Sequence, residues 1–129
     1  MRYLTTSSVA RLNAIEIGPN LLADEGLLDS AVARPQQSVG GEDAYPDIHT
    51  KGAALLESLT KNHPFIDGNK RTASLATAWF YGLNGWWLNA SQDELIRLVL
   101  DVAEGTLTGA DAIAVRLMPL AEEMTITEY

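Results

Sequence analysis

Nine consecutive residues, from His63 to Arg71, gather most of the side chains in this chain that could do chemistry. The run reads His-Pro-Phe-Ile-Asp-Gly-Asn-Lys-Arg and holds one candidate base, one carboxylate, one amide, two cations and a glycine. Pro64 prevents a preceding helical pattern from continuing, and a second helical pattern begins near Asn69. The run therefore lies where one helix ends and another begins, a place suited to binding a triphosphate.

The start of a helix offers backbone N–H groups that have no partner inside the helix, together with partial positive charge. Gly68 has no side chain, so a phosphate can approach these N–H groups closely. The amide of Asn69 can donate, and Lys70 and Arg71 add full positive charges. Asp67 directly precedes Gly68 in the chain, and a carboxylate beside phosphates is the usual ligand of Mg²⁺. We expect these residues to bind phosphate groups together with magnesium.

His63 precedes the anion-binding residues on the other side of the turn. A histidine there could accept a proton from an attacking hydroxyl. Base, anion cradle, cations and metal ligand together are the parts of a phosphoryl-transfer site. However, a histidine before a proline, an aspartate before a glycine and a Gly-Asn pair are each common as plain capping or turn residues. From the residues alone, an anion-binding site and an ordinary helix boundary both stay open.

Helical periodicity dominates the rest of the chain and predicts about six helices. The first lies around Val9, Leu12 and Ile15 and is closed by Gly18-Pro19; the others are expected at about 24–34, 48–62, 69–84, 91–103 and 109–122. Ser91 and Glu94 indicate a capping box. The helix at 69–84 is apolar almost all round, which is typical of the buried centre of a domain. We predict one all-α domain, residues 1–129, around this central helix.

Residues 36–47 form the longest stretch without a helical period, and long loops in compact domains tend to be functional. Short extended pieces are expected at 37–39 and 86–88, and a solvated tail from residue 122 onward. Lys51 is expected to be solvated, and His49 to face solvent or the loop 36–47.

The composition excludes several classes of protein. Seventeen acidic against nine basic residues give a formal net charge of -8, which argues against nucleic acid as a direct ligand, because phosphate-backbone affinity comes from basic surface. A chain of 129 residues suits one domain with one core. No apolar run reaches the roughly 20 residues of a membrane span, no signal peptide is visible, and cysteine is absent. We therefore expect a cytoplasmic protein that does not contact membranes.

The run 63–71 closely resembles the signature of the Fic/Doc family, His-Pro-Phe-x-Asp/Glu-Gly-Asn-Gly/Lys-Arg. Lys70, followed by Thr72-Ala73, resembles the Doc branch, the "death on curing" toxins of toxin–antitoxin pairs. Further likeness to that branch covers 26–28, 34–36, 45–46, Lys51 and 103–105. The resemblance implies the helical Fic/Doc fold with a short flap at 38–47, along which an extended target peptide could pair as an added strand.

The resemblance also implies a role for each residue of the motif. His63 would be the general base that deprotonates a target hydroxyl, and Asp67 would hold Mg²⁺. Gly68 and Asn69 would form the anion hole, and Arg71 would grip the nucleotide phosphates.

The family includes two chemistries. Most Fic proteins transfer AMP from ATP to a protein hydroxyl, whereas the Doc branch is understood to transfer the γ-phosphate of ATP to a threonine of elongation factor Tu and so arrest translation. AMP-transferring members usually have glycine where this chain has Lys70, and a second arginine where it has Ser74. Both departures favour an ATP- and Mg²⁺-dependent protein kinase toxin. An adenylyltransferase and a catalytically silent binding module of the same fold are the alternatives.

Many Fic proteins restrain themselves with a motif Ser/Thr-x-x-x-Glu-Gly/Asn. Only Glu25-Gly26 and Glu104-Gly105 offer its final pair here, and leucines, Leu21 and Leu100, stand where the hydroxyl residue should be. The sequence thus shows no self-inhibition motif. The resemblance therefore implies a Phd-like antitoxin protein that binds in trans and folds onto this chain.

Overall fold

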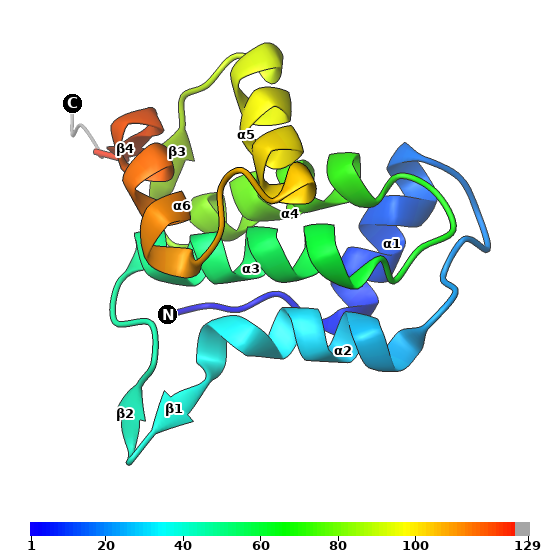
Figure 1. The fold of residues 1–129 in the computed structure, drawn as a ribbon, viewed down its shortest axis with the longest axis horizontal. Coiled ribbons are helices and arrows are strands. Elements are labelled where there is room, and N and C mark those ends of the chain that lie inside the picture. The colour runs from blue at the N-terminus through cyan, green and yellow to red at the C-terminus, as the bar shows by residue number, and fades with distance from the viewer. Residues whose placement is uncertain (126–129) are drawn as a thin grey trace.

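The computed structural model describes residues 1–125, and six α-helices make up most of them (Figure 1). They are α1 (Thr6–Glu16), α2 (Glu25–Ala33), α3 (Ile48–Asn62), α4 (Asn69–Leu83), α5 (Gln92–Glu104) and α6 (Ala110–Leu117), with short 3-10 helices η1 (Arg34–Gln36) and η2 (Met118–Leu120). The prediction of an all-α domain of about six helices is confirmed. None of the helices in this part of the chain is long and apolar enough to cross a membrane.

Two small antiparallel sheets accompany the helices. β1 (Ser38–Val39) pairs with β2 (Glu42–Asp43), and β3 (Trp86–Leu88) pairs with β4 (Ala121–Glu123). Gly40 and Gly41 join β1 to β2 with φ angles of 60° and 82°, the geometry that a two-residue hairpin turn needs. The extended pieces predicted at 37–39 and 86–88 are confirmed. The predicted tail is wrong for residues 122 and 123, which pair with β3; residues 126–129 lie outside the described residues.

Polar side chains fix where four of the helices begin. Thr5 caps α1, Asp24 caps α2, Asp47 caps α3 and Ser91 caps α5, each accepting a hydrogen bond from a backbone N–H of the first turn. Ser91 and Glu94 form the predicted capping box. These caps explain why the observed helix starts lie close to the predicted ones.

The central buried helix is α3, so the prediction that residues 69–84 occupy the centre is wrong. Residues 51–60 of α3 are all buried, and α3 contacts α2, α4, α5 and α6 (Figure 1). α4 buries one face through small residues such as Ala73 and Ala76, while Trp79 on another face stays 40% exposed. The pattern pointed to the wrong helix because α3 buries charged residues, which look like a solvated face in the sequence.

Lys51 is the clearest of these buried charges. Its side chain is 2% exposed, and its ammonium donates to the Pro35 carbonyl (3.1 Å) and to Asp43 of β2 (3.3 Å). The ammonium also lies over the ring of Tyr3, 5.4 Å from the ring centroid. The expectation that Lys51 is solvated is wrong, because these partners replace the water that its charge would otherwise need.

Two further sets of contacts join α3 to its surroundings, one at Glu57 and one at His49. Arg34 donates to Glu57 at 2.7 Å, and the other carboxylate oxygen of Glu57 accepts from the Gly109 N–H at 2.7 Å, at the start of α6. His49 Nδ1 is hydrogen-bonded to the Tyr81 hydroxyl at 3.0 Å. His49 therefore packs inward against α4, and the expectation that it faces solvent or the loop 36–47 is wrong.

The hairpin (β1–β2, residues 38–43) lies at the N-terminal end of α3, whereas His63 closes the C-terminal end (Figure 1). The 15 residues of α3 span about 22 Å, at about 1.5 Å per residue. The hairpin expected as a flap therefore exists, but it does not lie over the motif 63–71 within this chain, because an unbroken helix separates the two.

Candidate anion-binding site

The anion loop, residues 63–68 between α3 and α4, is held by the segment that joins α1 to α2. The Ile66 N–H donates to the Leu21 carbonyl at 2.8 Å, and the Ala23 N–H donates to the Pro64 carbonyl at 2.9 Å. Phe65 is only 4% exposed and anchors the loop in the core. The loop thus has a defined conformation that is fixed by neighbours far away in sequence.

Asn69 closes the loop from the other side. Its Oδ1 accepts from the Phe65 N–H at 3.0 Å, and its Nδ2 donates to the Phe65 carbonyl at 2.7 Å. The Phe65 backbone thus uses Oδ1 and one of the two N–H groups of Nδ2, and the second N–H of Nδ2 is the one that could donate to an anion. Asn69 also has a free-standing backbone N–H donor, at the first position of α4.

The start of α4 is left without a side-chain cap. Gly68 takes the N-cap position with a left-handed φ of 78°. The first N–H of α4 that bonds back along the helix is that of Thr72, to the Gly68 carbonyl at 2.8 Å. The N–H groups of residues 69–71 therefore have no partner inside the helix. They lie at an open depression of about 430 Å³, lined by His63 and residues 66–71. Unpaired N–H groups at such an opening suit an anion.

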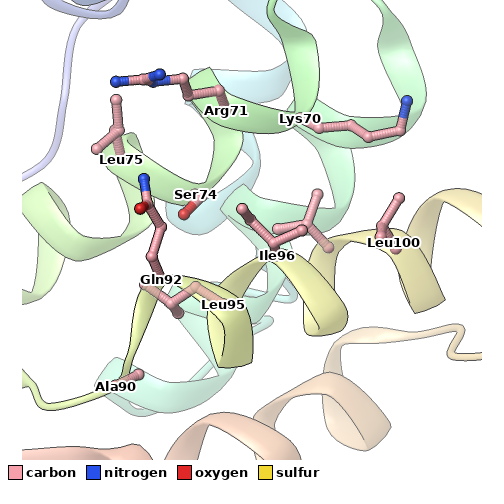
Figure 2. A pocket seen from close by; sticks show the side chains of 10 residues that line it. Lys70, Arg71, Ser74, Leu75, Ala90, Gln92, Leu95, Ile96 and Leu100 are labelled. Carbon is pink, nitrogen blue, oxygen red and sulfur yellow. The ribbon is translucent and has the colours of Figure 1, made fainter.

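Lys70 and Arg71 are exposed and supply the full positive charges of the depression. Figure 2 shows that their charged ends point in different directions from the first turn of α4. Arg71 Nη2 lies 3.6 Å from Glu16 Oε2 on α1, an exposed ion pair. A bound phosphate would compete with Glu16 for this guanidinium.

A second pocket, of about 420 Å³, adjoins the two cations and lies between α4 and α5 (Figure 2). Besides Lys70 and Arg71 it is lined by Ser74, Leu75, Ala90, Gln92, Leu95, Ile96, Val99 and Leu100. Apolar side chains predominate, and Ser74 and Gln92 supply polar groups from opposite helices. This combination suits a flat ring with a few polar atoms, such as a nucleobase.

His63 caps the end of α3 with φ 49° and ψ 55°. This left-handed conformation is uncommon outside glycine and carries strain, which tends to collect at functional sites. The side chain is exposed, and His63 shares the depression with Asp67 and the start of α4. The structure therefore brings the candidate base and the anion cradle to one opening.

Asp67 is exposed, and its Oδ1 accepts from the Gly68 N–H at 2.8 Å. Among residues 1–125 no group of three or more His, Cys, Asp or Glu could hold a metal ion. Mg²⁺, however, commonly takes one or two carboxylates and completes its shell with water and substrate phosphates. A single carboxylate beside a phosphate site fits a magnesium ion that arrives with a nucleotide.

The last turn of α1 also belongs to the site, and the sequence analysis missed it. Asn13 is 1% exposed and donates to the Asp67 carbonyl and the Thr72 hydroxyl, both at 3.1 Å. Ile17 packs against Gly68 so closely that a Cβ at Gly68 would lie 2.4 Å from Ile17 Cγ1. Glycine at position 68 is thus explained by its left-handed φ and by the closeness of Ile17, apart from any room that it leaves for a phosphate.

Comparison with known proteins agrees with this geometry. Residues 3–81 match the model of the Fic/DOC family. A protein named Toxin Doc from Mycolicibacterium smegmatis is 50% identical over 92 residues, which cover 70% of this chain and 71% of that protein. The family match includes the anion loop, the start of α4 and the turn of α1 that supports them. The chain therefore belongs to the Fic/DOC family, as the nine-residue motif predicts.

Proposed function

We propose that this chain is the toxin of a toxin–antitoxin pair and acts as an ATP- and Mg²⁺-dependent protein kinase. Family membership and the likeness to Toxin Doc support the toxin role. The observation that carries phosphoryl transfer is the uncapped start of α4, whose depression is shared by His63, Asp67, Lys70 and Arg71. Positive charge, a carboxylate and a base at one opening are the parts that this chemistry needs.

In the proposed step, the target hydroxyl oxygen bonds to the γ-phosphorus of ATP, the bond from that phosphorus to the β–γ bridging oxygen breaks, and ADP leaves. His63 accepts the hydroxyl proton. The N–H groups of residues 69–71, with Lys70 and Arg71, stabilise the charge that develops on the phosphoryl oxygens. Asp67 would hold Mg²⁺, which neutralises phosphate charge when it is bound.

Positions 70 and 74 support a kinase over AMP transfer. Lys70 stands at the first turn of α4, where AMP-transferring members usually have glycine. Ser74, one turn later, lines the pocket between α4 and α5 in place of the second arginine of those members (Figure 2). Compared with those members, the chain thus has a bulky cation instead of glycine at the phosphate site, and it lacks the cation that they have one turn later.

AMP transfer is the second candidate, and the pocket between α4 and α5 supports it. The pocket adjoins Lys70 and Arg71. A nucleobase bound there would bring the α-phosphate nearer to the anion loop than the γ-phosphate, because the base and the γ-phosphate are at opposite ends of ATP. The orientation of the nucleotide therefore decides between the two activities.

We propose a threonine of elongation factor Tu as the target and a Phd-like antitoxin as the partner that restrains the site. The resemblance to the Doc branch supports both. Ile66 is 71% exposed and lines the depression, so it offers an apolar contact to an incoming target segment.

The test incubates the purified chain with elongation factor Tu, Mg²⁺ and ATP labelled on either the α- or the γ-phosphate. The control is His63→Asn, because asparagine tolerates the left-handed backbone of this position. Transfer of the γ-label alone, lost in His63→Asn, is the expected result. Transfer of the α-label would establish AMP transfer instead. If neither label is transferred, the proposed reaction on this target is contradicted.

A further inference from the structure

We propose that Asn13 is a positioning residue for the anion site. It holds the anion loop and the first turn of α4 in the conformation that binds phosphate. This inference rests on the proposed function of the same site, and it adds to the site a residue that lies 54 positions before Asp67 in the chain.

The burial of Asn13 is the first observation. It follows Val9 by four residues, so the two share one face of α1, and Val9 is fully buried. Asn13 itself is 1% exposed. An apolar side chain at this point would avoid the cost of removing an amide from water. The amide is accommodated because its nitrogen has two acceptors, and both belong to the site.

The choice of acceptors is the second observation. Asn13 Nδ2 binds the carbonyl of the peptide unit that joins Asp67 to Gly68, at 3.1 Å. The N–H of the same peptide unit donates to Asp67 Oδ1 at 2.8 Å. This unit is therefore held from both sides. Gly68, with φ 78°, would otherwise let it rotate readily. The second acceptor, the Thr72 hydroxyl, ties the unit to the first turn of α4.

Two neighbours on α1 contact the same region. Glu16 and Ile17 follow Asn13 by three and four residues, so they share its face of the helix. Glu16 pairs with Arg71, and Ile17 packs against Gly68. Of these contacts, the hydrogen bonds of Asn13 set a peptide orientation, because apolar packing alone does not fix which way a carbonyl points.

Removal of the amide should therefore affect phosphate binding more than it affects folding. Asn13→Ala frees the peptide unit between residues 67 and 68, so the N–H groups of α4 lose their fixed direction toward the ligand. Asn13→Asp keeps the size but places a carboxylate against the Asp67 carbonyl, and should be worse. The matched control is Asn84→Ala. Asn84 donates to the Arg2 and Phe80 carbonyls, at 2.8 and 2.9 Å, at the opposite end of α4.

The experiment measures three properties of the wild type and of these variants: the Kd for Mg-ATP by titration calorimetry, the ¹⁵N amide resonances of residues 67–72, and the Tm. We expect Asn13→Ala to raise the Kd about tenfold and to shift those resonances. Asn84→Ala should leave the Kd within about twofold of wild type, at a comparable loss of Tm. A Kd for Asn13→Ala within about twofold of wild type, or unmoved resonances, would overturn the proposal.

Thr72→Val provides a second route in case Asn13→Ala does not fold. It removes the hydroxyl acceptor and keeps the shape, so the Kd should rise by a smaller factor; no rise would count against the proposal. If the wild type binds no Mg-ATP, the proposed function fails. The loop resonances of the Asn13 variants then decide the positioning role by themselves.

Discussion

The two ends of α3 use the same kinds of side chain in opposite ways. Toward the N-terminal end, each is held by a partner inside the fold: Lys51 by Asp43 and His49 by Tyr81, and midway along α3 Glu57 holds Arg34. At the C-terminal end, His63, Lys70 and Arg71 are exposed around one depression. Residue type therefore does not tell which end binds a ligand.

The two ends differ in whether their charged and polar groups already have hydrogen-bond partners inside the fold. A charge that already has its hydrogen-bond partners contributes to stability and has little left to offer a ligand. An exposed cation at an uncapped helix start keeps its interaction for an incoming anion. Substitutions at the N-terminal end and in the middle of α3 should therefore lower stability, and substitutions at the C-terminal end should lower activity.

The two histidines should show the largest difference. His63→Asn removes the proposed base, and we expect label transfer to fall about 10²- to 10⁴-fold with little change in Tm. His49→Asn loses the bond to Tyr81 and the edge contact with Trp86, so stability should fall by about 1 kcal/mol while transfer continues. Single-turnover transfer and thermal melting measure both. Equal effects of the two substitutions on transfer would remove the distinction.

The two arginines should differ next. Arg34→Met removes the charged partner of Glu57, whose side chain is 11% exposed and would then accept a hydrogen bond only from the Gly109 N–H. We therefore expect the free energy of unfolding to fall by about 3 kcal/mol. Arg71→Met should change stability by less than about 0.5 kcal/mol and raise the Kd for Mg-ATP about tenfold. Denaturant unfolding and calorimetry measure the two quantities. A destabilisation by Arg71→Met as large as that by Arg34→Met would contradict the comparison.

Lys51→Met tests whether the hairpin takes part in activity. The substitution leaves the Pro35 carbonyl without the ammonium, so we expect a loss of about 1 to 2 kcal/mol and faster amide exchange in the hairpin. The affinity for Mg-ATP should not change, because the hairpin is at the far end of α3. Loss of target modification at unchanged nucleotide affinity would instead show that the hairpin contacts the target.

The effect of Lys51→Met should not depend on pH near neutrality. Burial lowers the pKa of Lys51, but the neighbouring Tyr3 and Asp43 outweigh it and raise that pKa above the ordinary 10.5. A raised pKa means that the stabilisation is fully present below 10.5 and is lost only at higher pH. The difference between the variant and the wild type should thus be the same at about pH 6 and about pH 9.

The local features of the site could be read from the sequence because they depend on neighbouring residues. Asp24, Asp47 and Ser91 mark helix starts, and the run 63–71 indicates both the loop and the family. The position of the hairpin could also have been predicted, since the expected helix at 48–62 already separates it from His63 by about 22 Å.

Other features depend on contacts between distant segments and could not be predicted from local pattern. The burial of Lys51 requires Asp43 and Pro35 to meet it, and periodicity counts any lysine as solvated. Asn13 gave a weak signal, a polar residue four positions after Val9 on an apolar stripe. The signal indicates a buried partner but does not name it.

Arg71 is the exception to the comparison, because it has the exposed partner Glu16, and Glu16→Gln tests how much that pair matters. The side chains are 56% and 39% exposed and 3.6 Å apart, so the pair is weak. A phosphate must displace Glu16 to use Arg71 fully, so Glu16→Gln should lower the Kd for Mg-ATP about twofold. The gain should disappear at about 1 M salt, which screens the pair. Asp101→Asn, which removes the Arg116 ion pair elsewhere on the surface, is the control and should change nothing. A weaker affinity in Glu16→Gln would mean that Glu16 holds Arg71 in its binding orientation, and α1 would then position both the loop and its cation.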